Sequence, residues 1–484
     1  MNTFQKSKII LIGLFFLTTV AKSQTINEKI DEVMQRYTKL DQFSGTVLLA
    51  KDGEILYSKA FGDANKSFGI KNKVDTKFNI ASMGKMFTGV AIFQLQERGK
   101  LDINAPVIKY LKNFPLGDKI TIYHLLSHTS GLGSYMRHPD YRADRNAFKK
   151  IDDLLPLIYE EELQFDTPGE RFSYSNSGMI ILGAIIEKLT GQSYSDYITK
   201  NIFEPAKMYD TEMRCGDEVV QNRATGYMRS ISGKFHNNYS KSSPPSSDGG
   251  ILSTIGDILK FDQALYSSIL INNTSKEKMF TALKVTYGLA FQVEERQGNK
   301  VVGHSGGAPG ISTYFSRYLK DKYTIIVLSN YDRIARNVAH YIEYIVYGKK
   351  YKLPRPTFNQ FVYANMDNID TLGTLEDIND FIKKDYSINH PQYLNIAAYE
   401  FMNEGEVHFA IKLFKLNVQL FSKEANVYDS LGEAYEKNEQ YDLALKNYEK
   451  AVEVATEHSH RSLNSFKATL ERFKEKVNVI KTIK

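Results

Sequence analysis

Cysteine is almost absent from the sequence, since Cys215 is the only one. A single cysteine cannot close a disulfide within the chain, so the fold must be stabilised by its packed core. Glycine and proline are not in excess, which argues against a fibrous or largely disordered protein. At 484 residues, 42% of them hydrophobic, the chain is too long for one ordinary core and is expected to form two or three domains.

Long apolar runs are absent apart from one near the N-terminus, at residues 9–20. Lys6 and Lys8 precede this run, and AKS (21–23) follows it with a small-x-small cleavage pattern. About 12 apolar residues suit the core of a signal peptide, whereas a spanning helix needs about 20. We predict a signal peptide over residues 1–23, with an uncleaved anchor as the alternative. The mature chain is then exported, as a periplasmic or secreted bacterial protein without a membrane span.

An excess of charge of one sign is also missing. The formal net charge is +6, and Lys6, Lys8 and Lys22 leave with the predicted signal peptide, which brings the mature chain to +3. A net charge this small does not indicate the basic surface that nucleic-acid binding requires. The ten histidines show no metal-ligand spacing such as H-E-x-x-H, so no metal is expected. His124 and His128 are four residues apart but lack a partner acid, and we interpret them as structural.

Turn signals and hydrophobic periodicity predict strands at both ends of the first 350 residues, with helices between them. The expected strands form a hairpin over 43–62 and a group over 286–330, and helices are expected to begin near 82, 176, 253 and 334. An antiparallel sheet assembled from both ends and covered by helices fits this order. The predicted fold class is therefore α/β of the α+β type, with a helical subdomain at about 102–285.

The character of the sequence changes after KKYKLPRP (349–356), which is typical of a linker. Beyond it, small and aromatic residues coincide when the chain is compared with itself at an offset of 34, most clearly in YDSLGEAYEKNEQYDLALKNYEKA (428–451). This pattern resembles tetratricopeptide repeats. We expect a first domain over 24–350, a linker with a short helix over 351–390, and helical repeats with a capping helix over 391–484.

Ser82 and Lys85 are three residues apart in FNIASMGKMF (78–87), where a helical pattern begins. Such a pair shares one face of a helix, and a serine hydroxyl becomes nucleophilic when a base takes its proton. Lysine can be that base only in apolar or electropositive surroundings, because its usual pKa is about 10.4. Spacing alone does not decide the matter, because Ser275 and Lys278 repeat it in a charged segment that we interpret as structural.

A second motif contains Tyr174 and Asn176, in RFSYSNSG just ahead of an apolar helix. A tyrosine beside a lysine can relay a proton to a leaving group, and an asparagine can donate to a substrate carbonyl. Tyr-x-Asn is also common by chance. It recurs at 363–365 and at 393–395, and we interpret both recurrences as structural.

A third motif is GHSGGAPG, which places His304 at the predicted end of a strand with Gly306 and Gly307 behind it. Glycines there let a substrate approach the backbone closely. A free N–H of this strand can pair with that of Ser82 to form an oxyanion hole. The alternative is a strand that ends in a glycine-rich turn with a hydrogen-bonded histidine.

Together and in this order, the three motifs resemble those of the penicillin-recognising serine hydrolases, and the class C β-lactamase group with its related D-amino-acid peptidases and esterases is most similar. The resemblance covers about residues 27–348. Three further segments are similar to that family, namely LLSHTSGL (125–132), PGERFSYSNSG (168–178) and GGILSTIGDILKF (249–261).

The resemblance implies acyl transfer that needs no metal or organic cofactor. It gives Ser82 the role of nucleophile, with Lys85 and Tyr174 sharing the roles of base and acid. It implies that Asn176 orients the acyl chain and that the N–H groups of Ser82 and Gly307 hold the oxyanion. Water then releases the acyl group.

His304 departs from the Lys-Thr-Gly that ends the family pattern, in which the first residue helps to bind the substrate carboxylate. Histidine is mostly uncharged at neutral pH, so this attraction should be weaker than with lysine. The departure favours an esterase or D-peptidase over an efficient β-lactamase.

The predicted function is an exported serine hydrolase that acts on an ester, amide or D-amino-acid peptide bond of a small molecule or peptide. The alternatives are a true β-lactamase and a non-hydrolytic penicillin-binding-like sensor that works through its repeats. Such repeats usually bind peptides or partner proteins in a concave face, but they can also only buttress the hydrolase domain.

Overall fold

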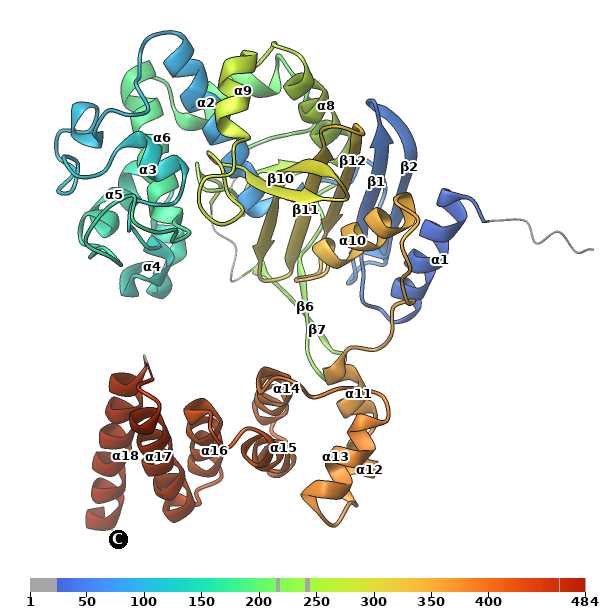
Figure 1. Ribbon diagram of the computed structural model, residues 1–484, viewed down its shortest axis with the longest axis vertical. Helices are drawn as coiled ribbons and strands as arrows, with labels where there is room; N and C mark the ends of the chain where they lie inside the picture. The colour runs from blue at the N-terminus through green and yellow to red at the C-terminus, as the bar shows by residue number, and fades with distance from the viewer. Residues whose placement is uncertain (1–23, 215–217, 240–243, 461, 484) are drawn as a thin grey trace, which may run out of the picture.

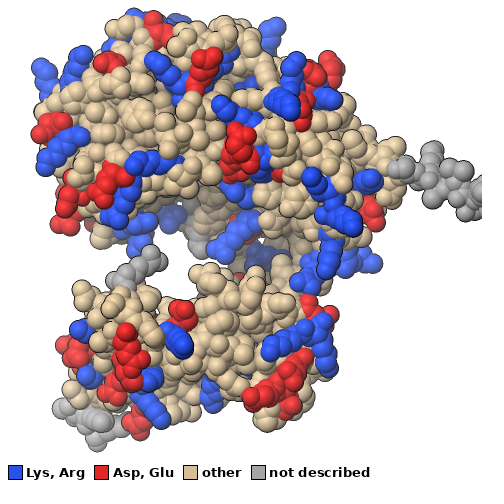
Figure 2. Space-filling model, in the orientation of Figure 1, with Lys and Arg blue, Asp and Glu red and all other residues tan. Residues whose placement is uncertain are grey.

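The chain forms two bodies, a larger one with a sheet and helices and a smaller one made of helices (Figure 1). Side chains of both charge signs are interspersed over the visible face of each body (Figure 2). In the described part of the chain, no helix is long and apolar enough to cross a membrane. The predicted signal peptide and Cys215 lie outside that part. This computed structural model describes residues 24–214, 218–239, 244–460 and 462–483.

A six-stranded antiparallel sheet forms the centre of the larger body, in the order β2-β1-β12-β11-β10-β9. The N-terminal hairpin joins the C-terminal strands because β1 pairs with β12, with Gly45 opposite Ser329. The prediction of an antiparallel sheet assembled from both ends is confirmed. Its strands are β1 (Gly45–Lys51), β2 (Glu54–Phe61), β9 (Gln292–Arg296), β10 (Asn299–Ala308), β11 (Ile311–Tyr318) and β12 (Tyr323–Ser329).

Helices cover both faces of this sheet, because successive strand residues point to opposite sides. Val47 and Leu49 belong to the apolar cluster formed with α1 and α10. Leu48 and Ala50 belong to the larger cluster on the other face, which includes α2 and α8. The four covering helices are α1 (Ile26–Lys39), α10 (Ala335–Val346), α2 (Lys85–Glu97) and α8 (Ile255–Tyr266).

A helical subdomain adjoins the sheet, with α6 (Asn176–Thr190) at its centre. This helix begins where Ser175 Oγ accepts a hydrogen bond from the N–H of Gly178 at 2.8 Å. It ends at Gly191, whose φ of 67° is the left-handed conformation predicted for a C-cap. Shorter elements of the larger body are β3 (Asp63–Asn65), β4 (Ile70–Lys71), β5 (Phe78–Asn79), β6 (Tyr227–Arg229), β7 (Phe235–Asn237), β8 (Leu252–Ser253), α3 (Ile122–Leu126), α4 (Pro139–Ala143), α5 (Ile151–Tyr159), α7 (Tyr194–Ile198) and α9 (Asn273–Met279).

A buried ion pair ties α8 to the sheet. Arg317 and Asp262 are 1% and 0% exposed, and Arg317 Nε lies 2.6 Å from Asp262 Oδ1. The other carboxylate oxygen accepts a hydrogen bond from Thr324 Oγ1 at 2.6 Å. Removing one partner of a buried pair leaves the other charge uncompensated in an apolar interior.

We expect Asp262→Asn to lower the free energy of unfolding by about 3 kcal/mol, because it leaves the Arg317 charge unneutralised. The matched control is Asp31→Asn, which removes the charge from the partly exposed pair of Asp31 with Lys59 but keeps an oxygen that can accept from Tyr57 Oη, and it should cost at most about 1 kcal/mol. Urea unfolding followed by circular dichroism measures both. Equal losses in the two variants would contradict a structural role for the buried pair.

The smaller body contains more helix near its start than the sequence predicts. The segment 351–390 was expected to hold one short helix, but it holds three. The missed signals are two capping boxes, in which Thr357 pairs with Gln360 and Thr374 pairs with Asp377. The helices of this body are α11 (Phe358–Ala364), α12 (Met366–Asp370), α13 (Leu375–Lys383), α14 (Gln392–Asn403), α15 (Val407–Leu420), α16 (Ala425–Lys437), α17 (Tyr441–Glu457) and α18 (Leu463–Ile483).

The later helices follow the period found in the sequence. Helix α14 packs on α15 and α16 packs on α17, while α18 packs on α17. Val407 and Tyr441 begin α15 and α17, and these starts are 34 residues apart. The helical character of this region is thus observed, whereas its assignment to the tetratricopeptide class stays a prediction.

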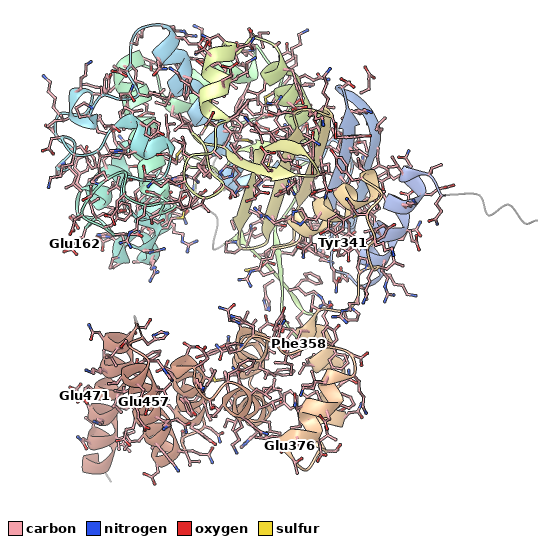
Figure 3. All side chains as sticks on the ribbon, viewed as in Figure 1. Glu162, Tyr341, Phe358, Glu376, Glu457 and Glu471 are labelled. Carbon is pink, nitrogen blue, oxygen red and sulfur yellow. The ribbon has the colours of Figure 1, made fainter. Side chains whose placement is uncertain are left out.

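The hairpin of β6 and β7 connects the two bodies. Its tip carries Ile231, which is 4% exposed and belongs to the apolar cluster of the smaller body. Beside it, the N–H of Ser232 donates to Glu404 Oε1 at 3.3 Å. Figure 3 labels Tyr341 of α10 and Phe358 of α11, which lie where the two bodies face each other. The smaller body is therefore attached by side-chain packing as well as by the connecting chain.

Candidate active site

Ser82 and Lys85 contact each other at the start of α2. Ser82 lies in a short 3-10 helix (Ala81–Gly84) and Lys85 is the first residue of α2. The Lys85 side chain is fully buried, and its Nζ donates to Ser82 Oγ at 3.1 Å and to the backbone oxygen of Asp248 at 2.5 Å. The lysine is therefore held against the serine hydroxyl in a site removed from bulk water.

The second Ser-x-x-Lys pair has a different geometry. Ser275 lies in the first turn of α9, where its Oγ donates to Glu97 Oε1 at 2.5 Å. It is buried, whereas Lys278 is exposed. The structural role predicted for this pair fits these surroundings, since the charged segment forms helix α9 and Ser275 is buried in its first turn. Burial and contact, which spacing does not encode, separate the two pairs.

A constrained turn presents Ser82. Ala81 has φ of 46°, a left-handed conformation that costs a non-glycine residue about 1–2 kcal/mol. Its N–H donates to Asn79 Oδ1 at 2.8 Å, which helps to hold this conformation. Gly249 packs against the turn so closely that a Cβ there would lie 2.3 Å from the backbone oxygen of Ala81. Strain of this kind concentrates at functional sites.

Tyr174 and Asn176 reach the same place from the start of α6. The Lys85 Nζ lies 5.1 Å from the centroid of the Tyr174 ring. This ring is 38% exposed and packs on the ring of His128 at 4.3 Å between centroids. Asn176 Nδ2 donates to Ser134 Oγ at 3.3 Å, which fixes the orientation of the amide. The first two sequence motifs therefore meet around Lys85.

The third motif is placed differently from the prediction. His304 lies in the middle of β10 rather than at its end, is 1% exposed and does not line the cavity next to Ser82. Gly306 is also buried, because a Cβ there would lie 2.3 Å from the backbone oxygen of Ile80. Neither residue lines the cavity, and the predicted contact of both residues with a substrate stays a prediction. Gly307 is exposed and does line the cavity.

His304 belongs to a buried hydrogen-bonded chain. The N–H of Ser175 donates to His128 Nδ1, which leaves His128 Nε2–H to donate to Tyr287 Oη at 3.1 Å. The Tyr287 hydroxyl then donates to His304 Nε2 at 3.0 Å, and His304 Nδ1–H donates to the backbone oxygen of Ser305 at 2.6 Å. Every hydrogen bond of this chain is satisfied when both histidines are neutral.

The electrostatics agree with this assignment. Burial, followed by the Lys85 charge, lowers the pKa of His304 to about 3. The same two causes hold the pKa of His128 well below its usual value. Neither histidine is therefore charged at neutral pH, so His304 offers no cation to a substrate carboxylate.

The buried His304 predicts a loss of stability in mild acid. Its pKa is about 6.5 when unfolded and about 3 when folded, so the unfolded state binds more protons and stability falls as pH drops below 6.5. Between pH 7 and pH 5, His304 alone should cost about 2 kcal/mol. Between pH 7 and pH 5, the free energy of unfolding of His304→Gln should fall by about 2 kcal/mol less than that of the wild type.

Urea unfolding at the two pH values measures this difference. The control is His236→Gln, which changes an exposed histidine and should leave the pH dependence as it is in the wild type. If His304→Gln and the wild type lose the same stability on acidification, then His304 is not buried as a neutral group.

The cavity beside Ser82 has a volume of about 250 Å³. The helical subdomain and the sheet both contribute to its walls. The residues that line it are Asn79, Ala81, Ser82, Tyr135, Met136, Tyr141, Arg145, Asn176, Asn238, Pro244, Asp248, Gly249, Gly250, Gly307, Ala308, Pro309 and Ile311.

Asp248 and Tyr135 are among the lining residues that sequence reasoning missed. Asp248 is buried between Lys85 and Tyr135, and its Oδ2 accepts a hydrogen bond from Tyr135 Oη at 3.1 Å. Burial raises the pKa of Asp248, while the Lys85 charge and the Tyr135 hydroxyl oppose that rise. The only local signal for Asp248 was its place before Gly249-Gly250. Among the described residues, no group of three or more His, Cys, Asp or Glu side chains is arranged to hold a metal ion.

Comparison with known proteins assigns the family. The model of the Beta-lactamase family matches residues 28–346. The chain belongs to the Beta-lactamase family. Within the Beta-lactamase family it is similar to "Penicillin-binding protein 4*" of Bacillus subtilis, with 31% identity over 410 residues, covering 78% of this chain and 90% of that protein. "Putative penicillin-binding protein PbpX" of the same organism is 33% identical and covers 64% of this chain and 76% of that protein.

Solved structures agree with this Beta-lactamase fold of serine hydrolases. A penicillin binding protein from Bacillus halodurans is 30% identical with a TM-score of 0.60, covering 64% of this chain and 98% of that one. An octameric penicillin-binding protein homologue from Pyrococcus abyssi is 28% identical with a TM-score of 0.61, covering 66% and 77%. A D-stereospecific amidohydrolase from Streptomyces, at 24% identity, a TM-score of 0.57 and coverage of 66% and 98%, shares the fold.

Proposed function

We propose that the protein is an active serine hydrolase that forms an acyl-enzyme on Ser82 from an ester, amide or D-amino-acid peptide bond. The observation that carries the proposal is the contact of Ser82 Oγ with the Nζ of a fully buried lysine, at the wall of a cavity. A serine hydroxyl in this position has a base within hydrogen-bond reach and space for a carbonyl carbon.

In the proposed reaction, Ser82 Oγ attacks the carbonyl while Lys85, in its neutral amine form, takes its proton. Tyr174, whose ring centroid lies 5.1 Å from Lys85 Nζ, relays a proton to the leaving group. The N–H groups of Ser82 and Gly307 stabilise the oxyanion; both residues line the cavity, and the strand of Gly307 packs against the turn that contains Ser82. Asn176 orients the acyl group, and water activated by Lys85 and Tyr174 then releases it.

His304 supports an esterase or D-peptidase over an efficient β-lactamase. In this role the family pattern uses a lysine, whereas His304 is neutral and lies behind the cavity wall. The names of the relatives support the same choice, because they include penicillin-binding proteins and, at the level of the fold, a D-stereospecific amidohydrolase. A β-lactamase, and a sensor that is acylated once without turnover, are the alternatives.

Mass spectrometry after incubation with a fluorophosphonate, and separately with benzylpenicillin, tests the proposal. We expect one fluorophosphonate adduct on the tryptic peptide that contains Ser82 and none on the peptide that contains Ser275. Slow or absent turnover of penicillin is expected together with hydrolysis of simple esters. Fast penicillin turnover would instead indicate a β-lactamase, and a lasting acyl adduct without any ester hydrolysis would indicate a sensor.

We also propose that the chain is exported after removal of residues 1–23, and that the helical repeats bind a peptide or partner protein. The support is the leader pattern in the sequence and the 34-residue period of the helices. N-terminal sequencing of the protein from the periplasm or the culture medium tests the cleavage site. Mature protein that still begins at residue 1 would indicate an uncleaved anchor.

A further inference from the structure

His128 holds the segment that carries Tyr174 at two points. The backbone oxygen of His128 accepts a hydrogen bond from the N–H of Ser173 at 2.8 Å. Its ring Nδ1 accepts a second hydrogen bond, from the N–H of Ser175 at 3.2 Å. These two serines are the immediate neighbours of Tyr174 in the chain. The backbone on each side of the tyrosine is therefore bonded to the same residue.

The His128 ring also supports the Tyr174 ring. The two ring centroids are 4.3 Å apart. Tyr174 is 38% exposed, whereas His128 is fully buried, so the tyrosine is supported from the interior of the protein. The centroid of the same tyrosine ring lies 5.1 Å from Lys85 Nζ. A displacement of the His128 ring would therefore change the distance between Tyr174 and Lys85.

The His128 ring is itself held in place. Its Nε2–H donates to Tyr287 Oη at 3.1 Å, and Tyr287 donates in turn to His304 of the sheet. The rings of Tyr287 and Phe172 pack on the imidazole at 4.8 and 5.9 Å between centroids. Burial keeps the pKa of His128 well below its usual value, so Nδ1 remains a hydrogen-bond acceptor at neutral pH. Both ring nitrogens thus have fixed partners.

The backbone of His128 is in an unfavourable conformation. Its φ is 54°, in the left-handed region that residues other than glycine seldom adopt. Ala81, which precedes Ser82, is in the same region. Strain of this kind persists where the surrounding structure enforces it, and it concentrates at functional sites. Both strained residues adjoin a residue that the proposed function uses, Ser82 in one case and Tyr174 in the other.

We propose that His128 is a positioning residue that holds Tyr174 beside Lys85 for proton transfer to the leaving group. This inference rests on the proposed function. The proton that Lys85 takes from Ser82 is passed to the Tyr174 hydroxyl, whose own proton goes to the leaving oxygen or nitrogen as its bond to the acyl carbon breaks. In this role His128 acts through the tyrosine and does not itself exchange a proton.

His124, four residues earlier, is the matched control. Its Nδ1 accepts a hydrogen bond from the N–H of Thr121, and its own N–H donates to Thr121 Oγ1, which caps α3. Spacing gave both histidines the same structural interpretation, but the structure connects His128 to the proposed site. His124→Gln should therefore affect the stability of the protein and not its activity.

Two esters of the same acid measure the role of His128. Ethyl valerate has an alkoxide leaving group that must be protonated as it departs, whereas the leaving group of p-nitrophenyl valerate is stable as an anion. We expect His128→Gln to lower kcat/KM by about 10- to 100-fold for ethyl valerate and by less than about threefold for p-nitrophenyl valerate. His128→Asn places an amide oxygen close to the position of Nδ1, and asparagine tolerates a left-handed φ, so it should be about 10-fold more active than His128→Gln on ethyl valerate. His124→Gln should stay within about twofold of the wild type on both esters.

A double variant tests whether His128 acts through Tyr174. Tyr174→Phe alone should lower kcat/KM for ethyl valerate at least as much as His128→Gln does, and the double variant should be no slower than Tyr174→Phe. Losses that multiply in the double variant, or equal losses for the two esters in His128→Gln, would overturn the positioning role and leave the catalytic proposal intact. If His128→Gln does not fold, Tyr287→Phe, which removes the hydroxyl that holds the His128 ring, should show the same pattern.

Hydrogen–deuterium exchange followed by mass spectrometry measures the hold of His128 without turnover. In the peptide that contains residues 173–175, backbone exchange should be about 10-fold or more faster in His128→Gln than in the wild type, and unchanged in His124→Gln. If the wild type hydrolyses neither ester but this difference is observed, the proposed catalytic function fails and the hold of His128 on the segment stands. Unchanged exchange in His128→Gln would overturn the inference whether or not the esters are hydrolysed.

Discussion

Replacing Ser82 with alanine is expected to lower kcat for ester hydrolysis by about 10⁴-fold or more, because no acyl-enzyme can form without the nucleophile. The structure should be preserved, since Ser82 lies at the cavity wall and the change removes one oxygen. Initial rates with p-nitrophenyl valerate measure the loss. Circular dichroism and thermal unfolding confirm that the variant is folded.

Ser275→Ala is the matched control, because Ser275 also precedes a lysine by three residues. Its hydroxyl donates to Glu97 and not to a lysine, so its removal should leave kcat within about twofold of the wild type. A Ser82→Ala protein that keeps a tenth or more of wild-type kcat would exclude Ser82 as the nucleophile. Residual activity of that size would indicate that another residue is the nucleophile.

Replacing Lys85 with methionine is expected to lower kcat by about 10³-fold, because Ser82 loses the base that takes its proton. Methionine has nearly the volume of lysine, so the packing around position 85 should survive. The free energy of unfolding should change by less than about 2 kcal/mol, because two effects oppose each other. The variant loses the hydrogen bond to the backbone oxygen of Asp248, but it also loses the cost of removing the lysine side chain's polar end from water. Lys85→Met should therefore lose nearly all activity while keeping most of its stability.

A second readout measures the charge that Lys85 carries in the absence of substrate, before its neutral form acts as the base. Lys85 lowers the pKa of both His128 and His304, so Lys85→Met should raise these values toward 6.5. The variant should then lose less stability than the wild type between pH 7 and pH 5. Lys278→Met, the control on the exposed face of α9, should change neither activity nor pH dependence. If Lys85→Met keeps full kcat, another group is the base.

The parts of the fold that could be predicted are those whose signals lie within a few residues. The hairpin over 43–62 and the helix beginning near 176 were predicted, and the local residues that end their elements, Asp52-Gly53 and Gly191, have left-handed φ values. Alternating apolar residues likewise predicted the sheet. The two capping boxes before α11 and α13 are equally local, and were missed because the segment had been interpreted as a linker.

The parts of the site that could not be predicted depend on contacts between distant segments. The bond from Lys85 to the Asp248 backbone joins residues 163 apart in sequence, so nothing near Asp248 indicates its place beside the lysine. The motif of His304 predicts a site residue. Its burial, however, depends on the hydrogen bond from Tyr287, which in turn bonds to His128.

The hairpin of β6 and β7 makes the larger body depend on the smaller one. Ile231 at its tip belongs to the apolar cluster of the smaller body, and Asn238, directly after β7, lines the cavity beside Ser82. A chain truncated after α10 would expose Ile231 to solvent, and the tip of the hairpin would lose the contacts that hold it in place. Exchange of helical regions between relatives in the course of evolution, or at the bench, therefore requires the hairpin tip to be exchanged with them.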